Sequence, residues 1–133
     1  MESILQPIKN LVPFQTTDWN TIKATECISY EQGKSCSRTM QWGDLRVRVV
    51  EYSAGYQADH WCTKGHILFC LEGEITTELK DGRQFKLKQG MSYQVSDDVI
   101  PHRSSTTTGA KLFIVDGGFL KIEKNNIQRG IWM

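Results

Sequence analysis

The chain has 133 residues, 39% of them hydrophobic, and its 16 Lys and Arg against 15 Asp and Glu give a formal net charge of +1. This length fits one compact domain, and a balanced charge without a basic run or stripe argues against nucleic acid as a partner. The longest apolar stretch, 67–71, is far too short to cross a membrane, and residues 1–20 lack the uninterrupted apolar stretch of a secretory signal.

The expected redox state of the four cysteines follows from the compartment that these features predict. Without a secretory signal we expect a cytoplasmic protein, and in a reducing cytoplasm Cys27, Cys36, Cys62 and Cys70 should be thiols. In an oxidising compartment Cys27 and Cys36 would be able to form a disulfide, although an even number of cysteines is weak support for one.

Residues 1–43 are predicted to form an extended arm with one or two strands, because prolines and a Thr-Thr-Asp-Trp-Asn sequence interrupt any longer element. We expect the arm to pack on the rest of the domain through four large apolar side chains: Phe14, Trp19, Ile22 and Trp42.

Residues 44–116 read as a series of short strands separated by turn sequences, which is typical of a sandwich or barrel. The Asp81-Gly82 pair predicts a two-residue hairpin turn of type I′, and Gly73-Glu74 predicts a break or bulge. The predicted strands are 45–52, 66–71, 75–79, 84–87, 91–95, a short strand after His102, and 111–115.

The tail, 117–133, begins with two glycines and ends close to Trp132. A Trp so near a terminus predicts docking on the domain or on a neighbouring subunit. Together with the apolar arm, it favours a homodimer, since a monomer would expose these apolar side chains. No ordinary amphipathic helix, repeat or linker is visible, so we expect a single all-β domain over residues 1–133.

All three histidines lie in two short blocks, 55–73 and 90–102. On a strand His60 and Cys62 would point to one face, His66 follows after a Lys-Gly break, and His102 stands behind Pro101. Neutral imidazole and thiolate are good ligands for zinc, iron and nickel. The sequence therefore predicts one divalent transition metal, of undetermined identity, held by His60, Cys62, His66 and His102.

Two kinds of site remain open. Three imidazoles and a thiolate complete a closed tetrahedral zinc site, whereas three imidazoles without the thiolate leave open positions on a ferrous ion. Taken singly, each of these residues reads more simply as an ordinary core or surface residue, so the prediction rests on their number and spacing.

Three further side chains are candidates for the surroundings of the metal. Asp59 would either accept a hydrogen bond from an imidazole or be solvated. Cys70 shares the parity of His66 and would either line the same interior or fill the core. Tyr93 would either offer its hydroxyl to a ligand or simply pack within a strand.

The two histidine blocks resemble the two motifs of the cupin superfamily. In the first cupin motif a His-x-His pair is followed by Glu and then Gly, and His60-x-Cys62, His66 and Gly73 stand at matching spacings. The second motif ends in a proline-containing turn and a His, as the block ending in Pro101-His102 does. The resemblance covers about residues 44–116. The Asp-His-Trp-Cys sequence 59–62 is similar, more narrowly, to that of small DHCW-motif cupins.

The resemblance implies a double-stranded β-helix, that is, a jelly-roll barrel with a divalent metal in its mouth, and frequent homodimers. It also implies a wide range of functions, so the activity must come from the site. Cys62 replaces the second His of the motif and His66 replaces the Glu, which shifts the ligand set toward soft or borderline metals.

Two functions are consistent with this pattern. The first is a metalloenzyme of oxygenase or isomerase type that acts on a small molecule. The second is a non-catalytic protein in which three histidines and Cys62 close around the metal and the barrel binds a small ligand or partner. The number of protein ligands distinguishes them, because a catalytic site keeps one position open.

Overall fold

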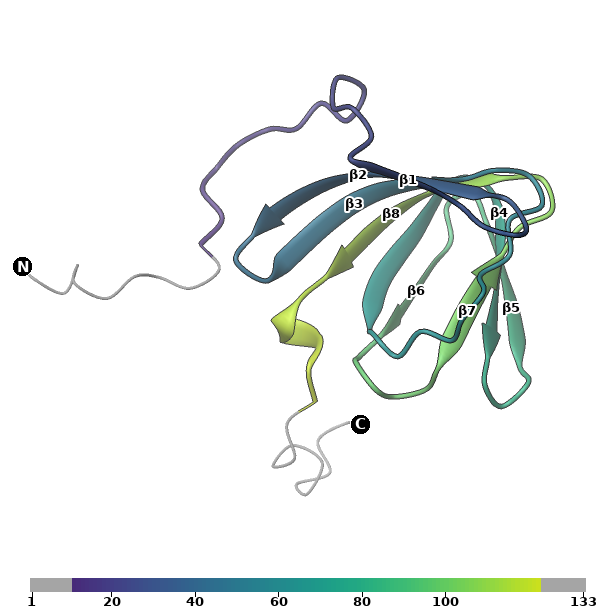
Figure 1. The fold of residues 1–133 in the computed structure, drawn as a ribbon. Coiled ribbons are helices and arrows are strands. Elements are labelled where there is room, and N and C mark those ends of the chain that lie inside the picture. The colour runs from purple at the N-terminus through teal and green to yellow at the C-terminus, as the bar shows by residue number, and fades with distance from the viewer. Residues whose placement is uncertain (1–10, 123–133) are drawn as a thin grey trace, which may run out of the picture.

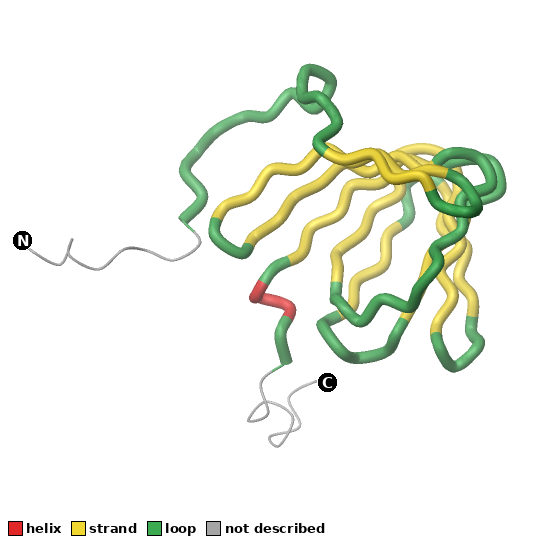
Figure 2. The backbone as a smooth tube through the Cα atoms, viewed as in Figure 1, coloured by secondary structure: helices red, strands yellow, loops and turns green. Residues whose placement is uncertain are grey.

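The computed structural model describes residues 11–122, so the predicted docking of Trp132 lies outside the described residues. Nearly all the regular structure of this part is β, with a single short 3-10 helix (Figure 2). The elements are β1 (Glu26–Ser29), β2 (Lys34–Trp42), β3 (Leu45–Tyr52), β4 (His66–Leu79), β5 (Gln84–Lys88), β6 (Ser92–Val95), β7 (His102–Ser105), β8 (Ala110–Asp116) and η2 (Gly118–Leu120). Within the described range, no helix is both long and apolar enough to cross a membrane.

The strands form two antiparallel sheets that share β4. The larger sheet has the order β1-β2-β3-β8-β4-β6, and the smaller one has β4 between β5 and β7. In Figure 1, β2, β3 and β8 lie side by side in one part of the molecule, and β6, β7 and β5 stand together in the other. The predicted all-β fold class is confirmed.

Strand β4 passes from one sheet to the other along its 14 residues. Its first half pairs with β8 and β6, and its second half pairs with β5 and β7. The register shifts between Cys70 and Glu72, beside Gly73 with a φ of 77°. The two strands predicted over 66–71 and 75–79 are therefore one bent strand, with its bulge close to the predicted break.

The core lies between the two sheets. Strand β8 alternates buried and half-buried side chains along its whole length, as a strand between core and outer surface should. The buried core side chains are Val50, Leu68, Cys70, Ile75, Leu87, Ala110, Leu112 and Ile114. The alternation continues to Asp116, which is therefore carried into the interior at the end of β8.

The turn between β4 and β5 differs from the predicted type I′ turn. Only Gly82 has a positive φ, of 96°, and the backbone N–H of Leu79 donates to the carbonyl oxygen of Arg83 across a longer loop. The Asp81 carboxylate accepts hydrogen bonds from the Arg83 backbone and guanidinium instead, which fixes the loop without a second left-handed residue.

The predicted arm contributes two strands to the larger sheet. β2 pairs with β3 from Ser35 to Trp42, and β1 pairs with β2 at the edge. Further toward the N-terminus, Trp19 packs edge-on against Phe113, with 6.1 Å between ring centroids. The predicted packing of Phe14 is wrong, since its side chain is 96% exposed.

Cys27 and Cys36 form a disulfide rather than the two thiols that we predicted. They are directly opposite each other in the β1–β2 pair, with Cα atoms 4.1 Å apart, which is the reason that they can bond. Cys62 and Cys70 are free. The expectation of free thiols is therefore wrong for this pair.

Candidate metal centre

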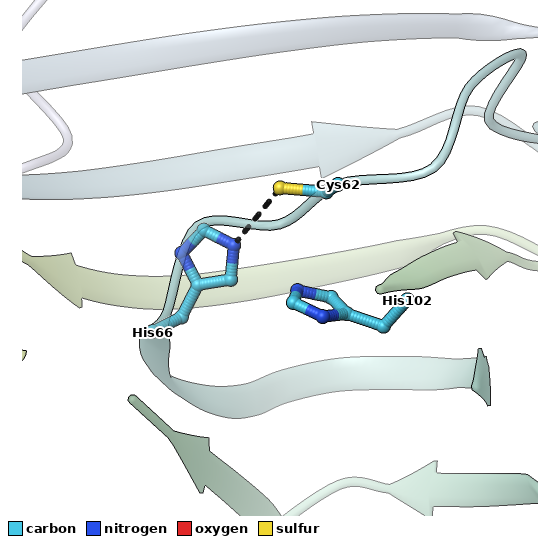
Figure 3. A group of neighbouring side chains, drawn as sticks. All are labelled: Cys62, His66 and His102. Carbon is cyan, nitrogen blue, oxygen red and sulfur yellow. Dashed lines mark hydrogen bonds between the residues drawn. The ribbon is translucent and has the colours of Figure 1, made fainter. Parts of the chain in front are cut away.

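Three of the four predicted ligands come together at one point of the barrel interior. Cys62 lies in the segment between β3 and β4, His66 opens β4 and His102 opens β7. Their ligand atoms all lie within 4.8 Å of one another (Figure 3). The backbone joins two of the segments, because Cys62 and His102 exchange N–H to carbonyl hydrogen bonds of 2.8 and 2.9 Å.

His66 is held by both of its ring nitrogens. Nδ1 lies 3.3 Å from Oδ2 of the Asp116 carboxylate, and Nε2 lies 3.8 Å from Cys62 Sγ. An ionised carboxylate only accepts hydrogen bonds, so Nδ1 carries the proton in the neutral ring. The Nε2 lone pair then faces the thiol, which is the orientation of a metal-ligating His backed by a carboxylate.

His102 is oriented in the same way by the backbone. Its Nδ1 donates a hydrogen bond of 2.9 Å to the carbonyl oxygen of Ile100, which leaves the lone pair on Nε2. That Nε2 is buried and has no hydrogen-bond partner in the protein. Buried polar atoms are nearly always paired, so an unpaired acceptor beside a thiol and a second imidazole indicates a ligand position.

The electrostatics of the site favour a thiolate at Cys62. The neighbouring imidazoles of His102 and His66 lower the pKa of the Cys62 thiol to about 5, although burial opposes this shift. Burial lowers the pKa of His66, but its contacts with Asp116 and Cys62 outweigh this effect and raise that pKa overall. A thiolate is the form of cysteine that binds metals.

Asp116 is the buried carboxylate behind the site. Only 1% of its side chain is exposed, and Arg46 donates to both of its oxygens at 3.0 Å, while Arg48 lies 3.3 Å from Oδ2. Burial raises the pKa of this carboxyl, but the hydrogen bonds from His66 and Arg46 and the two guanidinium charges hold it well below its usual range. Asp116 is therefore ionised and fixes the His66 ring.

The fourth predicted ligand, His60, lies outside this group. Its side chain is 70% exposed, and Nδ1 lies 2.7 Å from the carboxylate of Asp59, itself 62% exposed. The prediction placed His60 and Cys62 on one strand, but residues 59–60 form a bend, so the two-residue periodicity of a strand does not apply. Asp59 thus contacts an imidazole, as one of the two expectations had it, but this imidazole is that of His60 at the surface.

The two remaining candidates, Cys70 and Tyr93, have different surroundings. Cys70 is fully buried within the hydrophobic cluster and its Sγ approaches backbone carbonyls at 3.5 Å, so it fills the core away from the cluster of ligands. Tyr93 lies edge-on to His102, with ring centroids 6.1 Å apart, and lines the same cavity.

The three clustered residues open onto a cavity of about 290 Å³. Its walls combine the interior side of β3, residues on the β1–β2 hairpin and the segment before β4. His60 also lines this cavity, at the exposed side of the same segment. A cavity of this size accommodates a small molecule next to the candidate ligands.

Several solved structures have a fold similar to that of this chain. EutQ from Clostridium difficile is similar with a TM-score of 0.65 and 13% identity, over 77% of this chain and 85% of that one. A sugar phosphate isomerase from a cupin superfamily, from Silicibacter pomeroyi, is similar with a TM-score of 0.63 and 13% identity, over 77% and 75%. The chain has the cupin fold.

Iron(II)-bound HppE is a third similar structure, with a TM-score of 0.52 and 22% identity over 62% of this chain and 49% of HppE. No protein-family model matches the sequence, and no curated protein matches it. The predicted resemblance to the cupin superfamily and its jelly-roll barrel is thus confirmed at the level of the fold.

Sequence reasoning missed Asp116 and the two arginines that contact it. Asp116 follows the predicted strand 111–115 and has the parity of the apolar Leu112 and Ile114, so this parity was the available signal. No comparable signal exists for Arg46 and Arg48, because a half-buried strand normally turns its charged side outward.

Proposed function

We propose that this cupin binds one divalent transition metal through Cys62, His66 and His102 and acts on a small molecule in the adjoining cavity. The observation that carries the proposal is His102 Nε2, a buried acceptor without a partner that lies within 4.8 Å of the other two ligand atoms. Both imidazoles are held in the tautomer that leaves Nε2 free, so the ligands are oriented before a metal arrives.

The donor set supports a catalytic site over a structural one. Three protein ligands leave a position for water or substrate, whereas structural zinc sites use four. One thiolate with two imidazoles suits zinc better than magnesium or calcium, and iron and nickel are the other candidates. When bound, such an ion supplies Lewis acidity to a substrate oxygen.

Isomerase-type chemistry on a small molecule fits these ligands better than oxygenase chemistry. A thiolate favours zinc, and zinc has no redox chemistry with which to activate oxygen. The similar fold of the sugar phosphate isomerase from Silicibacter pomeroyi supports this choice, while the iron(II) form of HppE supports an iron site as the competing assignment.

The closed, non-catalytic site with four protein ligands is the second candidate, because His60 lines the same cavity. To join the metal, His60 would have to leave the Asp59 carboxylate, which lies 2.7 Å from its Nδ1. Because the histidine is exposed, this movement would break few packing contacts. A variant at His60 therefore distinguishes the site with three protein ligands from the site with four.

The test is the metal content of protein purified without chelating steps, by elemental analysis. We expect about one equivalent of zinc, iron or nickel in the wild type and in His60→Ala, and well under half an equivalent in Cys62→Ser and His102→Ala. A wild-type protein that binds no transition metal at several loadings contradicts the proposal. Loss of the metal from His60→Ala would assign the closed site instead.

A further inference from the structure

The cavity contains a buried donor that the proposed metal does not use. Arg48 lines the cavity from β3, and its Nε is buried without a hydrogen-bond partner in the protein. One terminal nitrogen of the guanidinium is engaged, since it lies 3.3 Å from Asp116 Oδ2. An N–H group left unpaired in a protein interior costs free energy, unless a ligand supplies the acceptor.

Unpaired buried atoms gather in one region of this fold. Within residues 11–122, the buried side-chain nitrogen and oxygen atoms without a partner belong to Arg48, Thr77 and His102. All three residues line the barrel interior, Arg48 and His102 in the cavity described above and Thr77 in a smaller one of about 220 Å³ that also touches His102. The interior is thus built for polar contacts that the chain alone does not complete.

The charges around the cavity select the sign of the ligand. Arg46 and Arg48 share one carboxylate, that of Asp116, and Arg103 is paired with Glu78 at 2.9 Å. Lys64 and Glu26, which also line the cavity, offset each other, so one guanidinium charge is left without a compensating carboxylate. A bound divalent cation would add more positive charge than the Cys62 thiolate removes, so the potential in the cavity favours an anion.

Three neutral phenol groups line the same cavity. The rings of Tyr52 and Tyr56 stack with 4.0 Å between centroids, and Tyr30 from the β1–β2 hairpin lies edge-on to Tyr56 at 5.3 Å. Burial raises the pKa of all three phenols, so they stay protonated and uncharged. They can donate hydrogen bonds to an oxygen-rich ligand without repelling its charge.

The donor and the candidate metal ligands are close together. Arg48 and His66 both approach the same oxygen, Oδ2 of Asp116, at 3.3 Å. A small molecule bound at the metal would therefore bring a second group near the Nε–H of Arg48.

We propose that the ligand of this cavity is a small organic oxyanion, a carboxylate or a phosphate ester, whose anionic oxygen accepts a hydrogen bond from Arg48 Nε–H beside the metal centre. This assignment rests on the proposed function for the role of the metal. The donor itself belongs to the protein, so the anion site can be tested with and without zinc.

The experiment follows the Arg48 Nε–H resonance of ¹⁵N-labelled protein by NMR during titration with acetate, inorganic phosphate and acetamide. Acetate and phosphate separate the two kinds of oxyanion, and acetamide matches acetate in shape without its charge. We expect one of the two anions to shift the Arg48 signal, while acetamide leaves it in place. Equal responses to acetate and acetamide, or none to either anion, overturn the proposal.

Two variants locate the effect. Arg48→Met should weaken binding of the effective anion by about tenfold or more, because a hydrogen bond to a charged group is lost. Arg38→Met is the matched control, since Arg38 also lies in the large sheet but contacts Ile22 and Glu51 outside the cavity. Unchanged affinity in Arg48→Met would show that the anion binds elsewhere, including at the metal, and would overturn the assignment.

The zinc-free and zinc-loaded titrations separate this inference from the proposed function. If the protein proves unable to hold a metal, the proposed function fails, but an Arg48-dependent shift in the zinc-free protein still supports the anion site. If zinc binds with the expected stoichiometry and Arg48 shows no dependence on the anion, only the present inference fails.

Discussion

His102 and His66 achieve the same orientation by different means. His102 donates its Nδ1 proton to a backbone carbonyl, and His66 donates to the buried carboxylate of Asp116. In both rings the second nitrogen, Nε2, is directed toward Cys62 and carries a lone pair, because the ring proton is on Nδ1. The site therefore depends on side chains that do not themselves reach the metal position, and Asp116 is the most deeply buried of them.

We expect Asp116→Asn to lower zinc affinity by about 10- to 100-fold without abolishing folding. The amide keeps the shape of the carboxylate but loses its charge, so it no longer fixes the protonated Nδ1 of His66 or balances Arg46. The measurement is a competition titration of zinc against a chelator.

Glu78→Gln is the control for that substitution. It removes the carboxylate that pairs with Arg103 at the same cavity but does not contact a candidate ligand. A zinc affinity that falls equally in both variants would show that general charge, rather than the contact with His66, determines binding.

Among the elements, β4 connects the candidate metal site to both sheets. It begins at His66, carries the core through Leu68 and Cys70, and crosses to the small sheet beyond Gly73. Strand β7, which begins at His102, pairs with the far end of the same strand, where Leu79 lies opposite His102. The bend in β4 therefore sets the distance between the two halves of the site.

We expect Gly73→Ala to destabilise the protein by about 2–3 kcal/mol, measured by urea unfolding. A Cβ at this residue would collide with the carbonyl oxygen of Gly109, and the φ of 77° is unfavourable for alanine.

The matched variant is Gly82→Ala, which has a φ of 96° but open space around its Cβ position. This substitution should lower the free energy of unfolding by only about 1 kcal/mol, which is the contribution of the unfavourable backbone conformation alone. Equal losses in the two variants would mean that close packing at the bend of β4 adds nothing.

For the whole molecule, the candidate ligands bring together two segments that are far apart in sequence. Cys62 and His66 flank the entry to β4, and His102 arrives some forty residues later from the opposite sheet. A metal bound to all three can bind only the folded barrel, so binding is linked to the stability of the entire fold.

We expect zinc to raise the unfolding temperature in a concentration-dependent way. At a free zinc concentration of 100 times Kd, the added stability should be about 2.7 kcal/mol. Differential scanning calorimetry at several zinc concentrations measures the shift, and Cys62→Ser should show little of it. A wild-type transition that does not respond to zinc contradicts a resident metal in this fold.

The homodimer and the cytoplasmic location stay predictions. Trp132, on which the argument for a dimer rests, lies outside the described residues. Light scattering of the full chain measures the oligomeric state directly. The disulfide between Cys27 and Cys36 is the feature to examine when the compartment is established.

The sequence by itself determined the strands and most of the candidate site. Alternating apolar residues and turn residues predicted β3, β4, β5, β6 and β8 to within one residue at their outer ends, and a short strand near the position of β7, because both signals depend on local backbone geometry. The spacing of the histidine blocks likewise predicted that Cys62, His66 and His102 belong to one site.

Only the tertiary structure decided which side of each strand faces the cavity and which neighbours surround the site. On β3 the arginines turn inward and Val49 lies on the outer face opposite Phe113, where Trp19 of the arm covers the sheet. Asp116 makes this inversion possible, since it compensates the charges of Arg46 and Arg48 in the interior. Alternation along a strand defines its two faces but does not say which face is buried, because burial depends on contacts with residues distant in the chain. A bend such as that at His60 also breaks the alternation, and the position of a bend depends on such contacts as well.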